Sequence, residues 1–221
     1  AEWKEFLAFM VHLRPSELIE RRVEMVMETH GLGKGTRYVA IHMRTELDWK
    51  EHAHGKCWSS PETIVRMVTS HSDFQQLKTK EARRPQKTSQ TILSSRSNND
   101  TSAALKVFVA TGDKPPALAA WAAVDGVEAF TSEEASEGLT WNQKAMLDWV
   151  LVQRAEMYIG SKTGSTFSLV GSQHHKGKSY GYGKEKLPGG DPEDPDVKDV
   201  FGRWDEVKYL SCYGVFGVHT R

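Results

Sequence analysis

Short apolar runs alternate with amphipathic stretches along most of the chain. The runs are nearly unbroken in hydrophobicity and rich in β-forming residues, which is typical of strands buried on both faces of a sheet. The expected strands span 38–44, 105–111, 127–130 and 157–160. The expected helices span 2–12, 16–30, 61–70, 115–123 and 142–154, with another starting at 166. Such alternation predicts an α/β fold with a parallel, Rossmann-like sheet and helices on both of its faces.

Two long polar stretches interrupt this pattern. Residues 84–102 are locally cationic and poor in large apolar side chains, and residues 171–196 combine many glycines with three prolines. Both compositions predict loops, and we expect the first to be mobile. The residues from 72 up to that loop are expected to be helical in part. Because no repeat is evident, we expect a single domain over residues 1–221.

The charge balance limits the classes of partner. Lys and Arg together number 29, as do Asp and Glu, so the formal net charge of the 221 residues is zero. A nucleic-acid-binding protein that uses the cationic segment 76–96 is therefore disfavoured, and this segment also lacks interleaved aromatic residues. No apolar window reaches the 18 or so residues that a membrane span needs. The first residues have neither the cationic start nor the cleavage site of a signal peptide.

The cysteines and histidines of the sequence offer few possibilities for a disulfide or a structural metal site. Cys57 and Cys212 are the two cysteines, and either one disulfide or two separate thiols fits their number. His52, His54 and Cys57 offer three zinc-binding side chains, but no fourth ligand follows at a suitable spacing. A polar loop is the favoured interpretation, and we expect no metal site.

The ends of the expected strands carry the candidate chemistry, because open parallel sheets bind ligands outside the carboxyl ends of their strands. The first strand ends in His42 and Arg44 and is followed by Glu46 and Asp48, while the second ends at Asp113. An arginine at the end of a buried strand needs an anionic partner. The planar guanidinium of Arg44 could bind a diphosphate, or it could form an ion pair with one of these three carboxylates.

The last expected strand runs through Gly164, Ser165 and Thr166 into a helix. Unpaired amide groups at a helix start and two hydroxyls can hold phosphate oxygens, although a simple Ser/Thr helix cap explains the same residues. The segment is not a Walker A loop, because Lys162 precedes the Gly-Ser-Thr run rather than dividing it.

Three segments in this order resemble the motifs of the protein O-fucosyltransferases. The run Tyr38-Val-Ala-Ile-His-Met-Arg-Thr-Glu-Leu-Asp-Trp49 is similar to the family's His-x-Arg-x-x-x-Asp-Trp motif. The run Leu105-Lys-Val-Phe-Val-Ala-Thr-Gly-Asp113 resembles a strand that ends in Ala-Thr-Asp. Residues 148–160, followed by Ser165-Thr-Phe167, resemble the motif Asp-(x7)-Asp-x-Phe-Ile-Gly with its terminal Ser-Ser-Phe.

The resemblance implies the C-terminal, nucleotide-binding half of a GT-B glycosyltransferase, and the N-terminal half is not evident. The implied activity is inverting transfer of fucose from the donor GDP-fucose to a hydroxyl of a protein or glycan acceptor. The alternative is a nucleotide-sugar-binding module or pseudoenzyme without independent catalysis. The resemblance implies no metal and no cofactor beyond the donor, and a location in the lumen of the secretory pathway, the ER or Golgi.

The resemblance also implies roles for individual residues. The implied nucleotide site consists of His42, Arg44, Asp113, Asp148, Glu156, Ser165, Thr166 and Phe167. Arg44 would hold the β-phosphate, and Glu156, in place of the family's Asp, has the two acceptor oxygens that guanine requires. Glu46 and Asp48 are candidate general bases for the acceptor hydroxyl, and Glu46 resembles the Arg-x-Glu-x-Asp of plant-type relatives. Structural roles remain open for three of these residues: His42 as a buried hydrogen-bonded side chain, Asp148 as a helix-surface carboxylate and Phe167 in core packing.

Overall fold

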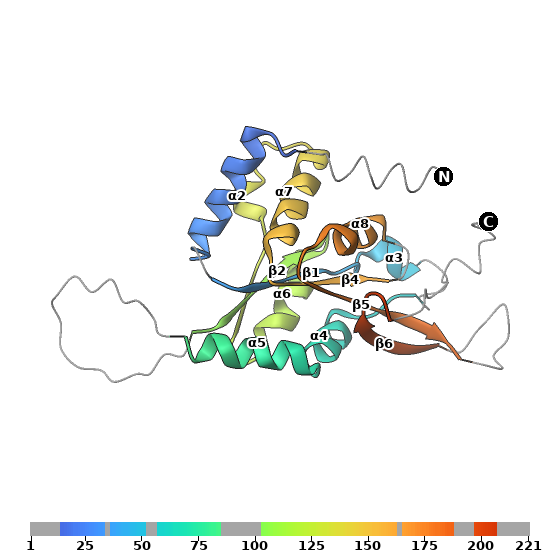
Figure 1. Ribbon diagram of the computed structural model, residues 1–221. Coiled ribbons are helices and arrows are strands. Elements are labelled where there is room, and N and C mark those ends of the chain that lie inside the picture. The colour runs from blue at the N-terminus through green and yellow to red at the C-terminus, as the bar shows by residue number, and fades with distance from the viewer. Residues whose placement is uncertain are drawn as a thin grey trace.

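A computed structural model describes residues 14–33, 36–51, 57–84, 103–162, 165–187 and 197–206, apart from the side chains of Thr166 and Lys186 (Figure 1). The helices are α2 (Glu17–Thr29), α3 (Leu47–Glu51), α4 (Pro61–Thr69), α5 (Ser72–Ala82), α6 (Lys114–Ala122), α7 (Trp141–Arg154), α8 (Thr166–His174) and the short 3-10 helix η2 (Glu133–Ala135). The strands are β1 (Tyr38–His42), β2 (Leu105–Ala110), β3 (Val127–Phe130), β4 (Met157–Ser161), β5 (Lys178–Lys186) and β6 (Val197–Arg203).

The strands form one sheet in the order β3-β2-β1-β4-β5-β6. Strands β1 to β5 run parallel to one another, and β6 pairs antiparallel with β5 at the edge. The chain proceeds from β1 outward to β2 and β3, then returns to place β4 on the other side of β1. The strand order therefore reverses between β1 and β4, which is where doubly wound sheets form their ligand crevice.

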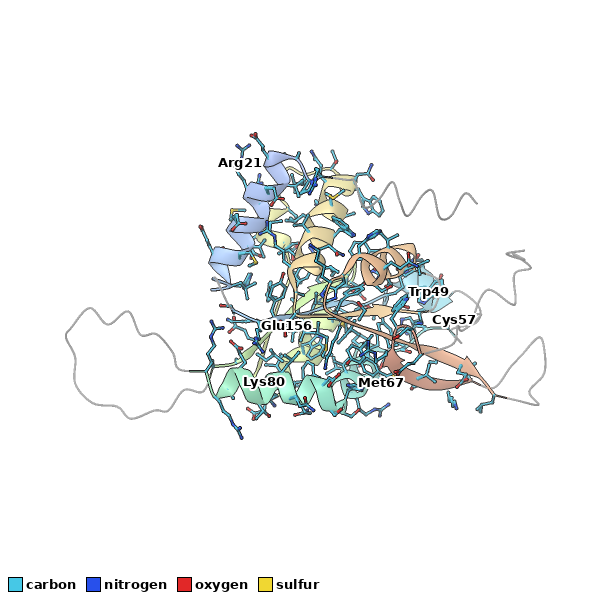
Figure 2. All side chains as sticks on the ribbon, in the orientation of Figure 1. Arg21, Trp49, Cys57, Met67, Lys80 and Glu156 are labelled. Atoms are coloured by element: carbon cyan, nitrogen blue, oxygen red, sulfur yellow. The ribbon has the colours of Figure 1, made fainter. Side chains whose placement is uncertain are left out.

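Helices cover both faces of the sheet, as the sequence predicts (Figure 1). Helices α4, α5 and α6 pack on one face, where Ile64, Phe74 and Trp121 are almost fully buried against the strands. Helices α2 and α7 pack on the other face around Val23 and Leu147. Helix α8 lies beside α7 and β4 on this second face. Figure 2 shows side chains filling the space between the sheet and both helix layers.

Local sequence signals set the helix starts. Ser16 caps α2 by accepting a hydrogen bond from the Ile19 amide, and Ser60 precedes Pro61 at the start of α4. Thr140 and Gln143 form a reciprocal capping box at the start of α7. The strands and helices expected from the sequence are confirmed to within about two residues wherever the structure describes them, and α5 confirms the helical part expected after residue 72.

The loop expected at 171–196 is wrong over much of its length. Helix α8 continues to His174, and β5 occupies Lys178–Lys186 in the sheet. Composition is misleading here because Tyr180 and Tyr182 alternate with glycines, and both tyrosines are buried against the α4–α6 face. Glycine at 181 is required: a Cβ there would lie 2.3 Å from the Cγ of Lys162.

Several expectations fall outside the described residues, namely the helix at 2–12 and nearly all of the loop at 84–102. Of the two alternatives for the cysteines, the disulfide is favoured, because Cys57 is disulfide-bonded; Cys212 lies outside the described residues. Among the described helices, none combines the length and the apolar character that crossing a membrane requires.

Candidate functional site

The switch point between β1 and β4 gathers most of the residues that the sequence singles out. Strand β1 ends at His42 and passes through Met43 to Arg44, while β4 ends at Ser161 and leads to the start of α8. The two strands are paired directly, with Ile41 opposite Ile159. Their carboxyl ends therefore bring a cation and a helix N-terminus to the same edge of the sheet.

Tyr182 fixes the backbone at the end of β1. Its hydroxyl donates to the carbonyl oxygen of His42 at 3.0 Å and accepts from the amide of Arg44 at 2.9 Å. Tyr182 belongs to β5 and lies opposite Ser161 of β4. Its side chain therefore reaches across β4 and links β5 to the end of β1. The link spans 138 residues of sequence and holds the backbone from which the Arg44 side chain projects.

The Arg44 guanidinium is held on three sides. Its Nη1 donates to Oε2 of Glu46 at 3.2 Å, and its Nη2 donates to Oδ2 of Asp48 at 2.9 Å. Its Cζ lies 5.5 Å from the centre of the Trp49 ring. The ion-pair alternative for Arg44 is thus present with Glu46 and Asp48, and a diphosphate would have to share or replace one of these partners.

Glu46 also connects Arg44 to the end of β2. Its second carboxylate oxygen, Oε1, accepts from the amide of Gly112 at 2.9 Å. Both oxygens of Glu46 therefore accept hydrogen bonds, one from a backbone amide and one from a guanidinium. A carboxylate engaged in this way suits a positioning role better than that of a general base. Asp48, with 68% of its side chain exposed, remains the more accessible of the two candidate bases.

His42 belongs to a chain of hydrogen bonds, and its burial keeps the ring neutral. The Ser161 amide donates to Oγ of Ser168 at 2.9 Å, and the Ser168 hydroxyl can in turn donate to Nδ1 of His42 at 2.7 Å. Oγ of Ser165 lies 3.4 Å from the same nitrogen. Burial, with a smaller contribution from the Arg44 charge, lowers the pKa of His42 to about 3. With Ser168 as the donor, the His42 ring proton lies on Nε2, and that nitrogen is then a hydrogen-bond donor.

The start of α8 confirms the helix-cap interpretation, while the anion site stays a prediction and its Gly164 lies outside the described residues. Oγ of Ser165 accepts from the Ser168 amide at 3.2 Å, so this serine is a helix cap. Thr166 is the first residue of α8, and its side chain lies outside the described part of the chain. The Phe167 ring packs 4.8 Å from the His42 ring and against the α2–α7 core, which supports a packing role. Other amides of this first turn remain suited to an anion.

Lys162 does not complete the anion site, although it directly follows β4. Its ammonium group donates to the carbonyl oxygen of Trp204 and lies 4.6 Å from the centre of the Trp204 ring. Only 5% of the residue is exposed, and burial lowers its pKa. The lysine therefore ties β4 to the turn after β6.

Two of the expected nucleotide-binding carboxylates lie near the neighbouring strand ends. Asp113 immediately precedes α6 and makes no side-chain capping hydrogen bond there. Its amide donates to the hydroxyl oxygen of Thr111 at 3.1 Å. Asp148, on α7, accepts a hydrogen bond from Ser132, which follows β3. Burial raises the pKa of Asp148 to about 6. No group of three or more metal-ligating side chains forms a metal site among the described residues.

Glu156 lies at the end of the sheet where the parallel strands begin, away from the other residues expected to bind the nucleotide. Its amide donates to the carbonyl of Tyr38, the first residue of β1, and its side chain is 48% exposed near Arg37. The five residues of β4 follow it, so roughly 16 Å of strand separates Glu156 from the carboxyl edge. Sequence spacing aligns it with an acidic motif position, and the strand expected at 157–160 already places it before that strand.

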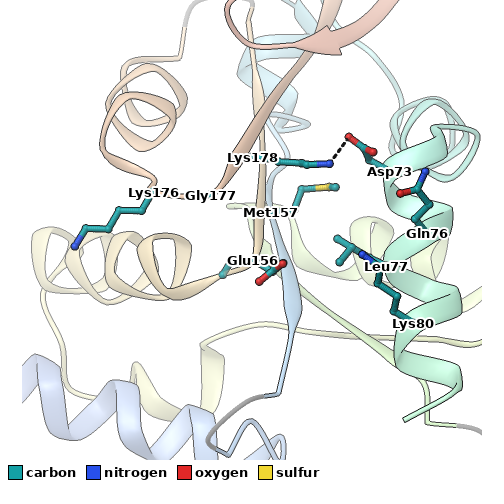
Figure 3. Close-up of a pocket in the computed structure, with 10 residues that line it drawn as sticks. Asp73, Gln76, Leu77, Lys80, Glu156, Met157, Lys176, Gly177 and Lys178 are labelled. Carbon is teal, nitrogen blue, oxygen red and sulfur yellow. Dashed lines mark ion pairs between the residues drawn. The ribbon is translucent and has the colours of Figure 1, made fainter.

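A cavity of about 510 Å³ lies at this amino edge and contains Glu156 (Figure 3). Asp73 and Lys178 line it and form a 3.0 Å ion pair, and Lys80 and Lys176 also contribute to its wall. Doubly wound sheets bind ligands outside the carboxyl ends of their strands, so the motifs predict a nucleotide site at the other end of the sheet from this cavity.

Sequence reasoning missed two residues that shape the site. Tyr182 was hidden in a glycine-rich segment expected to be a loop, although the alternation Tyr-Gly-Tyr-Gly at 180–183 is a possible strand signal. Ser168 lies one turn inside α8, three residues after its cap, and only its proximity to His42 reveals its part.

Comparison with known proteins gives structural similarity alone. No family model and no curated protein matches the chain. A fucosyltransferase NodZ from Bradyrhizobium is 16% identical with a TM-score of 0.38, over 84% of this chain and 48% of that one. NodZ α-1,6-fucosyltransferase co-crystallized with GDP is 17% identical with a TM-score of 0.39, over 84% and 47%. POFUT1 in complex with GDP is 19% identical with a TM-score of 0.41, over 78% and 48%. The chain thus spans about half the length of the fucosyltransferase chains to which it is similar.

Proposed function

We propose that this chain binds a GDP-sugar and forms the nucleotide-binding part of an inverting glycosyltransferase that moves fucose from GDP-fucose to a hydroxyl of a protein or glycan acceptor. The observation that carries the proposal is the convergence of Arg44 and the start of α8 at the β1–β4 switch point. A guanidinium and a helix N-terminus both favour negative charge, and a diphosphate supplies it.

The chemistry of transfer explains why such a site needs cations more than a strong nucleophile. As the acceptor oxygen bonds to C1 of the sugar, the bond from C1 to the β-phosphate oxygen breaks and its electron pair leaves with GDP. Arg44 would stabilise the charge that develops on this phosphate. The acceptor proton needs a base, and the exposed Asp48 is better suited to accept it than Glu46, whose two oxygens are engaged.

Neutral His42 would add a hydrogen-bond donor without changing the charge of the site. Its low pKa keeps it uncharged at physiological pH, and Ser168 favours the proton on Nε2. The choice of guanine and fucose rests on the motif resemblance around Arg44 and at residues 105–113 and 148–167. Because Glu156 lies at the end of the sheet where the parallel strands begin, we assign no residue to recognition of the guanine base.

The binding test is calorimetric titration with GDP, GMP and UDP, followed by turnover of GDP-fucose. Replacing Arg44 with Ala should weaken GDP binding at least tenfold, about 1.4 kcal/mol, and lower transfer by about 10²–10³. Arg66→Ala on the exposed face of α4 is the matched control and should leave both unchanged. Wild-type-like GDP binding in the Arg44 variant would contradict the proposal. Tight GDP binding without any turnover would instead favour the nucleotide-sugar-binding module.

We propose that binding needs no divalent cation. Arg44 and backbone amides can neutralise a diphosphate, and Asp113 alone is a thin ligand set for Mg²⁺ or Mn²⁺. GDP affinity should therefore survive excess EDTA. A tenfold fall that Mn²⁺ restores would place a cation in the site.

We also propose the lumen of the secretory pathway as the location. Support comes from the disulfide at Cys57, since disulfides persist in oxidising compartments. Expression of the tagged full-length protein followed by organelle fractionation tests this, and a cytosolic distribution would contradict it.

A further inference from the structure

The two carboxylates on Arg44 differ in how firmly they are held. Glu46 has 21% of its side chain exposed and Asp48 has 68%. Glu46 accepts from two donors, Nη1 of Arg44 and the amide of Gly112. Asp48 reaches Nη2 of Arg44 from the first turn of α3, as an exposed pair four residues apart in sequence. Exposed pairs of this kind are weak and are screened by salt.

Packing as well as hydrogen bonding secures Glu46. A Cβ on Gly112 would lie 2.9 Å from Oε1 and 3.1 Å from Cγ of Glu46, so the glutamate side chain lies directly against this glycine. Glycine at 112 is thus the residue that lets the β2 end approach the glutamate. The Trp49 ring, only 8% exposed, covers the guanidinium from another direction. Glu46 and Trp49 therefore hold Arg44, and the Asp48 side is the one open to solvent.

We propose that Arg44 exchanges partners when a diphosphate binds: phosphate oxygens replace Asp48 on Nη2, while Glu46 stays on Nη1 as the positioning residue. The proposal rests on the proposed function. A phosphate offers two oxygens to the planar fork, which an exposed single-contact carboxylate does not match. Departure of Asp48 also removes one negative charge from the immediate surroundings of the incoming anion, whereas departure of Glu46 would release the Gly112 amide as well.

The exchange predicts opposite effects for two conservative substitutions. Asp48→Asn removes the competing charge and should raise GDP affinity about two- to fivefold, the range of a weak exposed pair. Glu46→Gln weakens the link that aims Arg44 and should lower GDP affinity about tenfold, because hydrogen bonds to charged groups are the stronger ones. GMP, which lacks the β-phosphate, should respond little to either change. Calorimetry at fixed ionic strength measures all four affinities.

A third variant tests the positioning role without changing any charge. Gly112→Ala should displace the Glu46 carboxylate and reproduce the loss of GDP affinity caused by Glu46→Gln, with GMP again little affected. Gly33→Ala is the matched control, since a Cβ there meets nothing within 4 Å. Thermal melting of each variant separates this effect from unfolding.

The outcomes distinguish this proposal from the one on which it rests. Wild-type protein that does not prefer GDP over GMP would overturn the proposed function. Wild-type protein that prefers GDP, with Asp48→Asn and Glu46→Gln both weakening it alike, would overturn only the exchange. An unchanged GDP affinity in a folded Gly112→Ala variant would remove Glu46 from its positioning role.

Discussion

Asp148 provides a sharp test of the electrostatics inside the fold. This carboxylate, midway along α7, is partly buried against the segment after β3 and accepts a hydrogen bond from Ser132. Burial raises its pKa from 3.8 to about 6, against smaller opposing effects of the Ser132 hydrogen bond and the Lys114 charge. At neutral pH the folded protein therefore carries a charge in a place that favours the neutral acid.

The sign and size of the effect follow from this pKa. A carboxyl group whose pKa is raised by folding does not lower the unfolding free energy at a pH below its unfolded pKa near 4, because both states are protonated there. Its unfavourable contribution grows between about pH 4 and pH 6 and is complete above that range. A difference of about two pKa units corresponds to about 3 kcal/mol at 1.36 kcal/mol per unit. The remaining contact of Asp148 with solvent makes this figure an upper limit.

Asp148→Asn removes the charge while keeping an oxygen that can accept from Ser132. The unfolding free energy of the variant should equal that of the wild type near pH 4 and exceed it by up to about 3 kcal/mol at pH 7. Urea denaturation followed by circular dichroism at half-unit pH steps measures the difference. Asp125→Asn, in an exposed turn, is the matched control for the loss of one carboxylate. A variant less stable than the wild type at pH 7 would refute the reasoning, because it would show that the folded state stabilises the Asp148 charge.

Two further predictions concern the hydrogen bonds and packing of the site. The imidazole resonances of His42 should not titrate between pH 5 and 8, because burial lowers its pKa to about 3. Ser168→Ala should change the nitrogen chemical shifts of this ring as the preferred tautomer is lost, and unchanged shifts would contradict the hydrogen bond from Ser168 to Nδ1. Gly181→Ala should destabilise the protein by about 1–3 kcal/mol, since its new Cβ would lie 2.3 Å from Cγ of Lys162, and Gly33→Ala should be mild by comparison in the same thermal unfolding experiment.

The local pattern of the chain determines most of its elements. Nearly unbroken apolar runs at 38–44 and 105–111 specify buried strands because both faces of such strands must be covered. Ser16 and Thr140 specify helix starts because their side chains satisfy backbone amides within three residues. These interactions are short in sequence, so a window of ten to fifteen residues contains the information. The alternation of the elements then implies a parallel sheet with two helix layers.

Which residues share an edge of the sheet is also partly legible from the sequence. His42 and Arg44 follow one strand and Ser165 follows another, and in a parallel sheet the carboxyl ends meet. The structure brings these three to the switch point. Glu156 differs from them because it precedes its strand, which places it at the other end of the sheet. Its match to an acidic motif position in sequence carries no information about that distance in space.

Only the tertiary structure decides which partners the site residues have. Tyr182 reaches the Arg44 amide across 138 residues of sequence, and Glu46 reaches Gly112 across 66. Ser168 meets His42 across 126 residues. No local preference encodes such contacts, because they depend on strand order, register and the room that glycine leaves. The sequence by itself thus determined most of the elements and the end of the sheet where the candidate chemistry gathers, whereas the packing of distant strands determined strand β5 and how Arg44 and His42 are held.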